Sequence, residues 1–206
     1  MCEEVFEMVC AMDRRNIELQ IALQCAPCLA GLKTSNLLIV PKEDEEKVRF
    51  VLRHTRLQNF RLAYDRKRVI FLVFNRGMLS EYLATNEVKS FLNGLGYKTD
   101  SFGYILRTFK DRYSAYITLK SEFPHEMGLL LGYPYKDVVG FIEHHGRDFK
   151  LSGYWKVYDD AEYMSKLFDE FDYAKDDMVR LISTGTSIKE IIDLYQNDEL
   201  SERKAV

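Results

Sequence analysis

The sequence predicts an α+β protein in which N-terminal helices pack on a small, mostly antiparallel sheet. Two patterns carry this prediction. Apolar residues recur at helical spacing through much of the chain, and two runs of β-forming residues flank the charged turn at 65–68, as in a hairpin. Helices come first, then the hairpin, then more helices and a further group of short apolar runs. This segregated order is typical of the α+β class.

Length and composition exclude several classes of protein. A chain of 206 residues suffices for one domain with a sizeable core, and no linker or repeat divides it, so we expect a single domain over 1–206 with a frayed tail at 197–206. A net charge of −3 gives no general attraction to nucleic acid or to anionic membranes. No apolar run is long enough to span a bilayer. The acidic N-terminus lacks the pattern of a signal peptide, so we expect a cytoplasmic protein with reduced thiols.

The first half of the chain predicts helices followed by the hairpin. Residues 1–24 show helical spacing, and either Asp13 or Asn16 is placed to cap a second helix. Pro27 favours the first turn of a helix and disfavours helical geometry at the residue before it. We therefore expect a separate short helix that begins at Ala26 or Pro27 and ends at Gly31. The next elements are a strand at 37–40, an amphipathic helix at 43–57, and hairpin strands at 60–64 and 69–74.

The second half predicts helices and a meander of three strands. The helices are expected at 77–94 (one or two), from Asp100 or Ser101 to Leu119, from Ala161 to about Ile182, and from Ser187 to about Tyr195. Short apolar runs bounded by proline and glycine predict strands at 125–131 and 137–143, and an alternating run predicts a third at 149–158. The aromatic stripe of the helix at 101–119 is typical of a helix packed on a core.

The candidate chemistry begins at Cys25, which the predicted helix start at Ala26 or Pro27 places at the mouth of a helix. Free N–H groups and the positive dipole end at that point favour a thiolate, the form that acts as a nucleophile. Such a nucleophile needs a base and a residue that orients the base. We expect His125 as the base and Asp137 as the orienting carboxylate, since each begins a predicted strand.

Supporting residues complete this hypothesis. Glu126 and Asp148 are alternatives to Asp137 as the orienting carboxylate. The side-chain amide of Gln20 or Gln24, with a backbone N–H at the helix start, is placed to stabilise an oxyanion. The chemistry that these residues predict is cysteine-dependent acyl transfer from a thioester or amide to an amine or to water. It requires no metal and no cofactor.

The order of glutamine, cysteine at a helix start, histidine and aspartate resembles the papain-like cysteine hydrolases and transferases, although the Cys-Trp and glycine patterns of that family are absent. The motifs Cys25-Ala26-Pro27, Phe123-Pro124-His125-Glu126, Gly132-Tyr133-Pro134, Asp137-Val138 and Gly153-Tyr154-Trp155-Lys156-Val157-Tyr158 are also similar to a family of unknown function from anaerobic bacteria. Some papain-like enzymes of natural-product biosynthesis, such as the closthioamide-type amide synthases, move an acyl chain from a carrier protein to an amine. The resemblance implies a papain-like architecture and the triad Cys25, His125 and Asp137. It also implies an acyl-carrier protein or small thioester as donor and a small amine as acceptor.

Three alternatives remain open at this point. Cys25 and Cys28 form a C-x-x-C pair, as in thiol–disulfide oxidoreductases, although the surrounding βαβ pattern is missing. The same pair with His54, His144 and His145 lacks the second pair of ligands of a structural zinc site. The third alternative is a non-catalytic binding or regulatory protein with a structural Cys25. The basic run Arg66-Lys67-Arg68 is expected at the hairpin tip, where it is placed to touch an acidic carrier protein.

Overall fold

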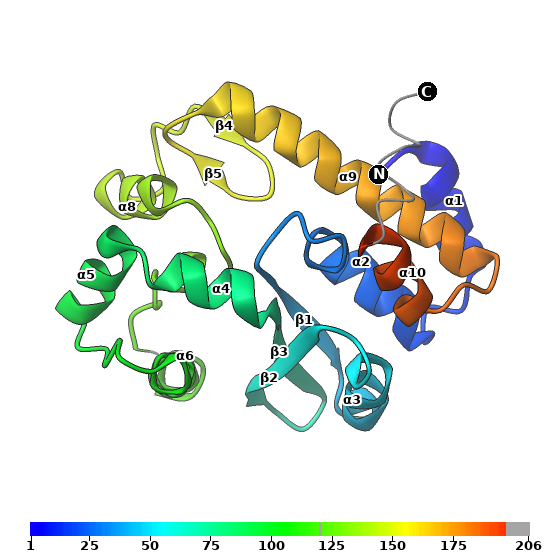
Figure 1. Cartoon of the computed structure of the whole chain (residues 1–206), viewed down its shortest axis with the longest axis horizontal. Helices are drawn as coiled ribbons and strands as arrows, with labels where there is room; N and C mark the ends of the chain where they lie inside the picture. Colours follow the sequence, from blue (N-terminus) through cyan, green and yellow to red (C-terminus); the bar gives the residue numbers. More distant parts are fainter. Residues whose placement is uncertain (120, 197–206) are drawn as a thin grey trace. The chain divides into compact units, whose positions relative to one another are not determined.

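The computed structural model describes residues 1–119 and 121–196, which form two compact units (Figure 1). Unit 1 comprises Met1–Asn75 and the described part of the chain from Asp169, and unit 2 comprises Arg76–Phe168. The boundary lies inside the long helix α9 (Ala161–Ser183). Each unit is described by itself. The predicted frayed tail at 197–206 lies outside the described residues.

Unit 1 contains a three-stranded antiparallel sheet with the strand order β1-β3-β2. The predicted hairpin is confirmed, and its turn is held by Asp65, whose Oδ1 accepts the N–H groups of Lys67 and Arg68 at 2.7 Å each. The elements of the unit, besides the later part of α9, are α1 (Glu3–Ala11), α2 (Ile17–Leu29), β1 (Ser35–Pro41), the 3-10 helix η1 (Lys42–Asp44), α3 (Glu45–Leu52), β2 (Leu57–Tyr64), β3 (Arg68–Asn75) and α10 (Ile188–Gln196).

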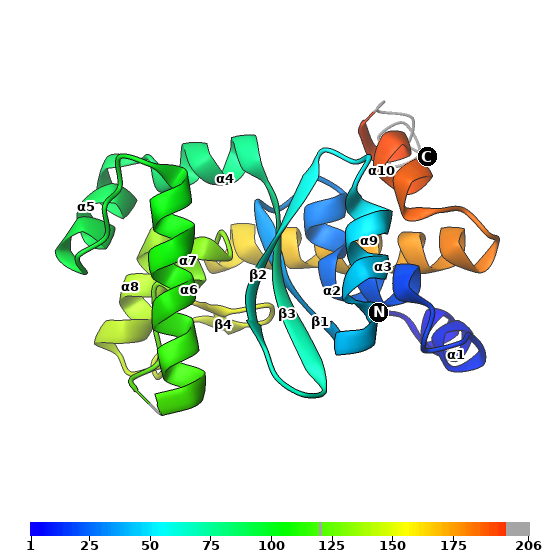
Figure 2. The same ribbon diagram turned by 90° about the horizontal axis from the view of Figure 1, so that it is seen from below.

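The core of unit 1 lies between one face of this sheet and the helices α2, α3 and α10. Alternate residues of the strands, among them Leu38, Val40, Phe71 and Val73, point to this face and are fully or almost fully buried. Figure 2 shows α2 and α3 on the same side of the sheet. The central strand β3 carries the apolar run expected of a strand with neighbours on both sides.

Helix α2 overturns the predicted helix start at Ala26 or Pro27. It begins after Asn16, whose Oδ1 accepts the N–H groups of Glu18 and Leu19, and it continues through Pro27 to Leu29. A proline inside a helix costs about 3 kcal/mol. Burial of the apolar face of α2 in the core outweighs this cost, because fully burying a single large apolar side chain contributes roughly 1.5–3 kcal/mol. Cys25 therefore lies inside a helix and not at its mouth.

Unit 2 is mostly helical, and two of its predicted strands are helices instead. The run predicted as a strand at 125–131 forms a turn followed by α7 (Met127–Leu130), and the run at 137–143 lies within α8 (Tyr135–Glu143). Of the strand predicted at 149–158, only β4 (Leu151–Ser152) and β5 (Lys156–Val157) form, as a small hairpin. The predicted helices are confirmed as α4 (Arg76–Leu83), α5 (Asn86–Gly94), α6 (Phe102–Leu119) and α9.

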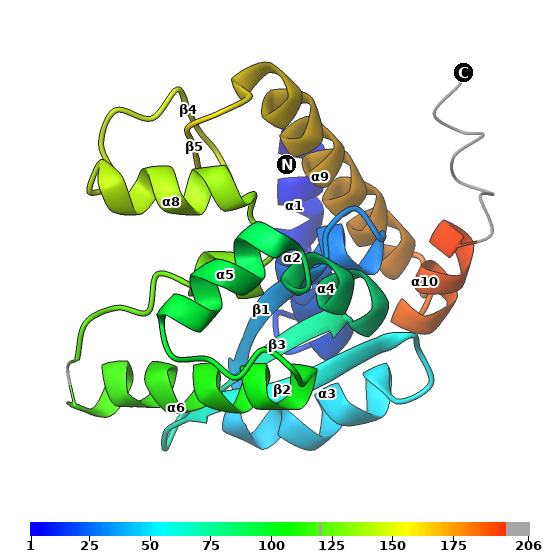
Figure 3. The same cartoon turned by 60° about the vertical axis from the view of Figure 1, so that its left-hand side comes forward.

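The wrong strand predictions have a common physical reason. A short apolar run fits a buried strand and a buried helical turn equally well. Pro134 decides the second case, because it occupies the N-cap of α8 in an extended conformation that leads directly into the helix. Figure 3 shows α8 beside the β4–β5 hairpin. None of the helices in residues 1–119 and 121–196 has the length and apolar character that crossing a membrane requires.

The packing of α8 on the hairpin segment makes a testable prediction at Gly140. A Cβ atom at this position would lie 2.6 Å from Cγ of Tyr158, a separation that forces the ring or the helix to move. We expect Gly140→Ala to lower the free energy of unfolding in urea by about 1–3 kcal/mol. Gly94→Ala is the matched control, since no atom lies within 4 Å of its added Cβ. Equal stability of both variants would show that Tyr158 does not pack against α8.

Candidate functional site

Cys25, the predicted nucleophile, is fully buried in the core of unit 1. Its Sγ points to the backbone oxygen of Leu37 at 3.9 Å. Burial raises the pKa of Cys25 well above its ordinary value, and the neighbouring Cys28 adds to this effect while the nearby Lys33 opposes it. Burial likewise raises the pKa of Cys28 to about 12. Both side chains are therefore neutral thiols at physiological pH, without access to a substrate carbonyl in this arrangement.

The glutamines predicted to stabilise an oxyanion have structural partners. The Gln24 amide lies at the outer edge of β1, where its Oε1 accepts the N–H of Ile39 at 2.9 Å and its Nε2 donates to the Ile39 oxygen at 3.1 Å. The side chain thus replaces a neighbouring strand and covers an otherwise open sheet edge. Gln20 donates from Nε2 to the backbone oxygen of Arg14 at 3.0 Å. The two amides thus connect α2 to the preceding turn and to β1.

His125, the predicted base, lies in unit 2 in an exposed turn before α7. Its ring contacts two aromatic rings, those of Phe123 and Phe141, with centroid separations of 5.4 and 5.6 Å. The adjacent Glu126 is buried, and its Oε1 accepts hydrogen bonds from Tyr97 Oη at 2.8 Å and from Arg112 Nε at 2.5 Å. Glu126 therefore ties α6 to the turn that leads into α7.

Asp137, the predicted orienting carboxylate, has other partners than His125. Only 2% of the residue is exposed. Its Oδ2 accepts the indole N–H of Trp155 at 2.8 Å, and its Oδ1 accepts the backbone N–H groups of Tyr158 at 2.7 Å and Asp159 at 3.2 Å. These bonds join α8 to the β4–β5 segment. The Gly-Tyr-Trp-Lys-Val-Tyr motif thereby has a structural role, which Tyr133 extends by stacking on Trp155 at 4.7 Å.

A histidine–carboxylate pair does occur in unit 2, at a different place. His144 Nδ1 lies 3.5 Å from Asp148 Oδ2, and the imidazole stacks on Tyr158 with a centroid separation of 5.6 Å. Both members are exposed. No group of three or more His, Cys, Asp or Glu side chains in the described part of the chain is placed to hold a metal ion.

A hollow in unit 2 is the site that the sequence did not reveal. It has a volume of about 230 Å³ and lies where α5, α8 and α9 begin. Its lining comprises Tyr82 of α4; Thr85, Glu87 and Val88 at the start of α5; Pro134, Tyr135, Lys136 and Asp137 at the start of α8; and Asp159, Asp160 and Met164 at the start of α9. The available signal was the group of residues at predicted helix starts, such as Asp160 directly before the helix predicted from Ala161.

The hollow combines carboxylates with aromatic rings. Lys136 and Asp159 form an ion pair at 2.8 Å, which raises the pKa of Lys136 and lowers that of Asp159. Tyr82 donates its hydroxyl hydrogen to the Tyr133 oxygen, and burial raises the pKa of Tyr82. The ring of Tyr135 is held edge-on by Phe91 at 6.0 Å. Polar groups and flat apolar surface thus converge on one concave site.

Comparison with known proteins places the chain in a family. Residues 21–192 match the family described as "Protein of unknown function (DUF3793)". The chain belongs to this family of unknown function. The match runs from α2 into α10 and so includes parts of both units. No curated protein and no solved structure matches the chain.

The bonds of Asp137 predict that its charge supports the fold. In Asp137→Asn one acceptor becomes an NH₂ group that faces N–H donors, so we expect a loss of about 2–4 kcal/mol in the free energy of unfolding. Trp155, the only tryptophan, reports the transition by its fluorescence. Asp148→Asn is the control, because Asp148 is exposed and asparagine tolerates its left-handed φ of 56°. Parent-like stability of Asp137→Asn would contradict this role.

Proposed function

We propose that this protein is a non-catalytic binding protein and that the hollow of unit 2 binds a small organic cation, such as a primary amine. The observation that carries the proposal is the charge of the lining. The lining carries one cation, Lys136, and four carboxylates, which gives it a formal charge of −3. The carboxylates belong to Glu87, Asp137, Asp159 and Asp160.

The helix starts around the hollow oppose this charge without cancelling it. Acidic residues in a first turn commonly compensate the helix dipole, whose N-terminal end is equivalent to roughly +0.5 charge. The helices α5, α8 and α9 begin here, so their dipoles together supply about +1.5 against the formal −3. Lys150, whose Nζ donates to the backbone oxygen of Asp159 at 2.7 Å, adds one further positive charge beside the lining. A negative potential therefore remains, and it favours a cation over an anion.

Size and aromatic lining narrow the class of ligand. A hollow of about 230 Å³ is smaller than typical sites for drug-sized molecules, which have roughly 300–1,000 Å³. Tyr82 and Tyr135 offer ring surface, on which an ammonium group gains about 0.5–1 kcal/mol at exposed sites. Val88, Pro134 and Met164 add apolar surface for a short hydrocarbon body. A small amine with an apolar body satisfies all three features.

Cysteine-dependent acyl transfer with a carrier-protein donor, and the papain-like architecture that it implies, stay predictions that no comparison tests. The local structure favours the binding protein instead. A nucleophile must be a thiolate within reach of its substrate, whereas Cys25 is buried and its pKa is raised. The expectation of a cytoplasmic protein likewise remains a proposal that rests on the composition of the sequence.

The binding proposal predicts a ligand preference set by charge. We expect 2-phenylethylamine to bind with a Kd on the order of 1 mM, a value suited to so small a ligand, and to bind at least about tenfold more tightly than 2-phenylethanol. Glu87→Gln, which removes one exposed carboxylate of the hollow, should weaken amine binding about three- to tenfold. Glu81→Gln, an exposed carboxylate outside the lining, is the matched control.

Titration followed by NMR chemical shifts provides the measurement. The proposal fails if the alcohol binds as tightly as the amine, or if Glu87→Gln and Glu81→Gln have the same effect. Tighter binding of 3-phenylpropionate than of the amine would show that the helix dipoles dominate the hollow.

The thiols provide a separate test against the enzymatic hypothesis. We expect two cysteines, the exposed Cys2 and Cys10, to react with iodoacetamide in the native protein at pH 8. Cys25 and Cys28 should react only after unfolding, because both are buried and protonated. Peptide mass mapping identifies the labelled residues. Rapid labelling of Cys25 in the native protein would instead support the nucleophile.

A further inference from the structure

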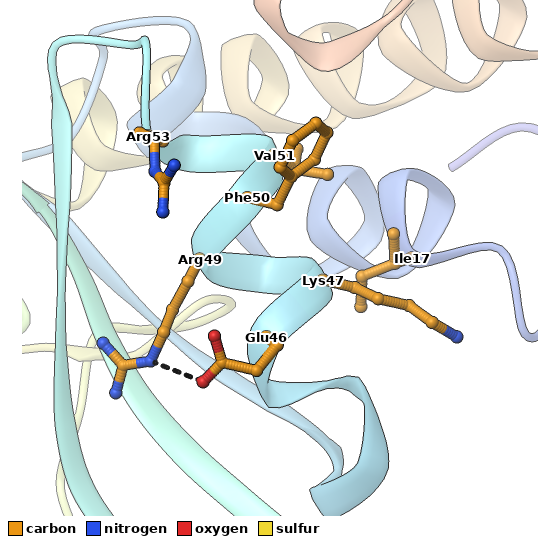
Figure 4. A pocket seen from close by; sticks show the side chains of 7 residues that line it. All are labelled: Ile17, Glu46, Lys47, Arg49, Phe50, Val51 and Arg53. Atoms are coloured by element: carbon orange, nitrogen blue, oxygen red, sulfur yellow. Dashed lines mark ion pairs between the residues drawn. The ribbon is translucent and has the colours of Figure 1, made fainter.

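A second candidate site lies on α3 of unit 1, separate from the hollow of unit 2. Figure 4 shows the residues around it, which come from α3, from its C-cap residue Arg53 and from the first residue of α2. The space is an open hollow of about 480 Å³. Its apolar part consists of Ile17, Phe50 and Val51. Ile17 and Val51 also pack against the core of unit 1, so this part of the hollow has a firm base.

Phe50 is the unusual member of this surface. The residue is 73% exposed, so its phenyl ring contributes little to the stability of the fold. Aromatic side chains that are exposed in the free protein and ringed by polar groups are typical of protein interfaces, which bury such a residue at their centre. The position of Phe50 beside a hollow therefore points to a partner.

Cations surround the apolar part of the hollow. Lys47, Arg49 and Arg53 line it together with one acid, Glu46. Lys47 and Arg49 also pair with acids of their own segment, Lys47 with Asp44 at 2.7 Å and Arg49 with Glu45 at 2.9 Å. The backbone N–H of Arg53 donates to the Phe50 oxygen, but its side chain has no hydrogen-bond or ion-pair partner within residues 1–119 and 121–196. Its guanidinium is free to pair with a carboxylate from outside.

The positive charge extends from α3 to the hairpin. Arg61 of β2 shares the Glu45 carboxylate with Arg49, at 2.9 Å, and so joins the two elements. The exposed turn Arg66-Lys67-Arg68 follows on the same hairpin. Residues 42–68 carry nine Lys or Arg and five Asp or Glu, a net charge of +4 in a chain whose total is −3.

We infer that this surface docks an acidic protein segment that inserts an apolar side chain beside Phe50. Carboxylates of the partner pair with Arg53, Lys47 and Arg49, while its apolar side chain covers Ile17 and Val51. An apolar centre with a charged rim is the usual arrangement of a protein interface. A nucleic acid fits less well, because its phosphates would meet Glu46 among the cations and the chain as a whole carries a net charge of −3.

Three synthetic helical peptides test the inference by fluorescence anisotropy. The first carries Glu residues around a central Leu and Phe, the second replaces every Glu by Lys, and the third keeps Glu but replaces Leu and Phe by Ser. We expect only the first to bind with a Kd below about 1 mM, and to bind about tenfold more weakly when NaCl is raised from 50 to 500 mM, because exposed charges are screened.

Variants assign the binding to this surface. Arg53→Glu and Phe50→Ala should each weaken binding of the first peptide about tenfold. Lys89→Glu makes the same charge change on an exposed residue of α5, and Phe6→Ala removes an exposed ring of α1, so both should bind as the parent does. Circular dichroism checks that every variant is folded.

Four outcomes would overturn the inference. They are no binding of the first peptide, equal binding of the first and third peptides, equal loss in Arg53→Glu and Lys89→Glu, and tighter binding of a single-stranded DNA oligonucleotide that Arg53→Glu abolishes. The last outcome would assign the surface to nucleic acid. None of them bears on amine binding in unit 2.

Discussion

The buried carboxylate of Asp137 is the interaction on which unit 2 depends most. Burying a charge costs several kcal/mol unless hydrogen bonds replace the lost water. Three N–H donors do so here, one from Trp155 and two from the backbone at Tyr158 and Asp159. Because these bonds fix α8 against the chain segment that leads into α9, they also fix two sides of the hollow. The fold and the candidate site therefore rest on the same carboxylate.

Burial and the surrounding hydrogen-bond donors together set the protonation state of the buried cysteines and of Asp137. A carboxylate can remain charged inside a protein when donors surround it, whereas a thiol with fewer donors is kept neutral. Both thiols point to backbone carbonyl oxygens. Lys33 and, for Cys28, a backbone hydrogen bond with Asn75 favour the thiolate, but burial outweighs them and keeps both pKa values raised. The same core that makes α2 stable despite Pro27 thus keeps Cys25 buried as a neutral thiol.

Local signals in the sequence predicted much of the fold. The hairpin followed from alternation around a charged turn, α6 and α9 from long helical periods, and the start of α2 from Asn16, one of two caps considered. Two kinds of feature escaped. Pro27 lies inside α2 although proline locally favours a helix start, because burial of the helix outweighs that preference. The runs at 125–131 and 137–143 are too short for their apolar pattern to distinguish a strand from a helix. At these positions tertiary packing, and not the local sequence, determines the secondary structure.

The candidate site was harder to predict because its contacts join residues far apart in the chain. Asp137 was predicted as the orienting carboxylate of a triad, but its partner Trp155 lies 18 residues away and the sequence spacing does not reveal this contact. The partners of Glu126, Arg112 and Tyr97, are likewise far from it in the sequence, so local patterns do not predict these contacts. The hollow lies where three helices begin. Each helix start has an ordinary sequence, so their proximity is visible only in the folded structure.

The most direct test of the central claim is a map of amide chemical-shift changes in the ¹⁵N-labelled protein on titration with 2-phenylethylamine. The account predicts saturable shifts centred on Val88, Tyr135, Lys136 and Met164, at the starts of α5, α8 and α9, with little change in the core of unit 1. Saturable shifts centred on another surface, or only small linear shifts spread over the protein, would contradict it.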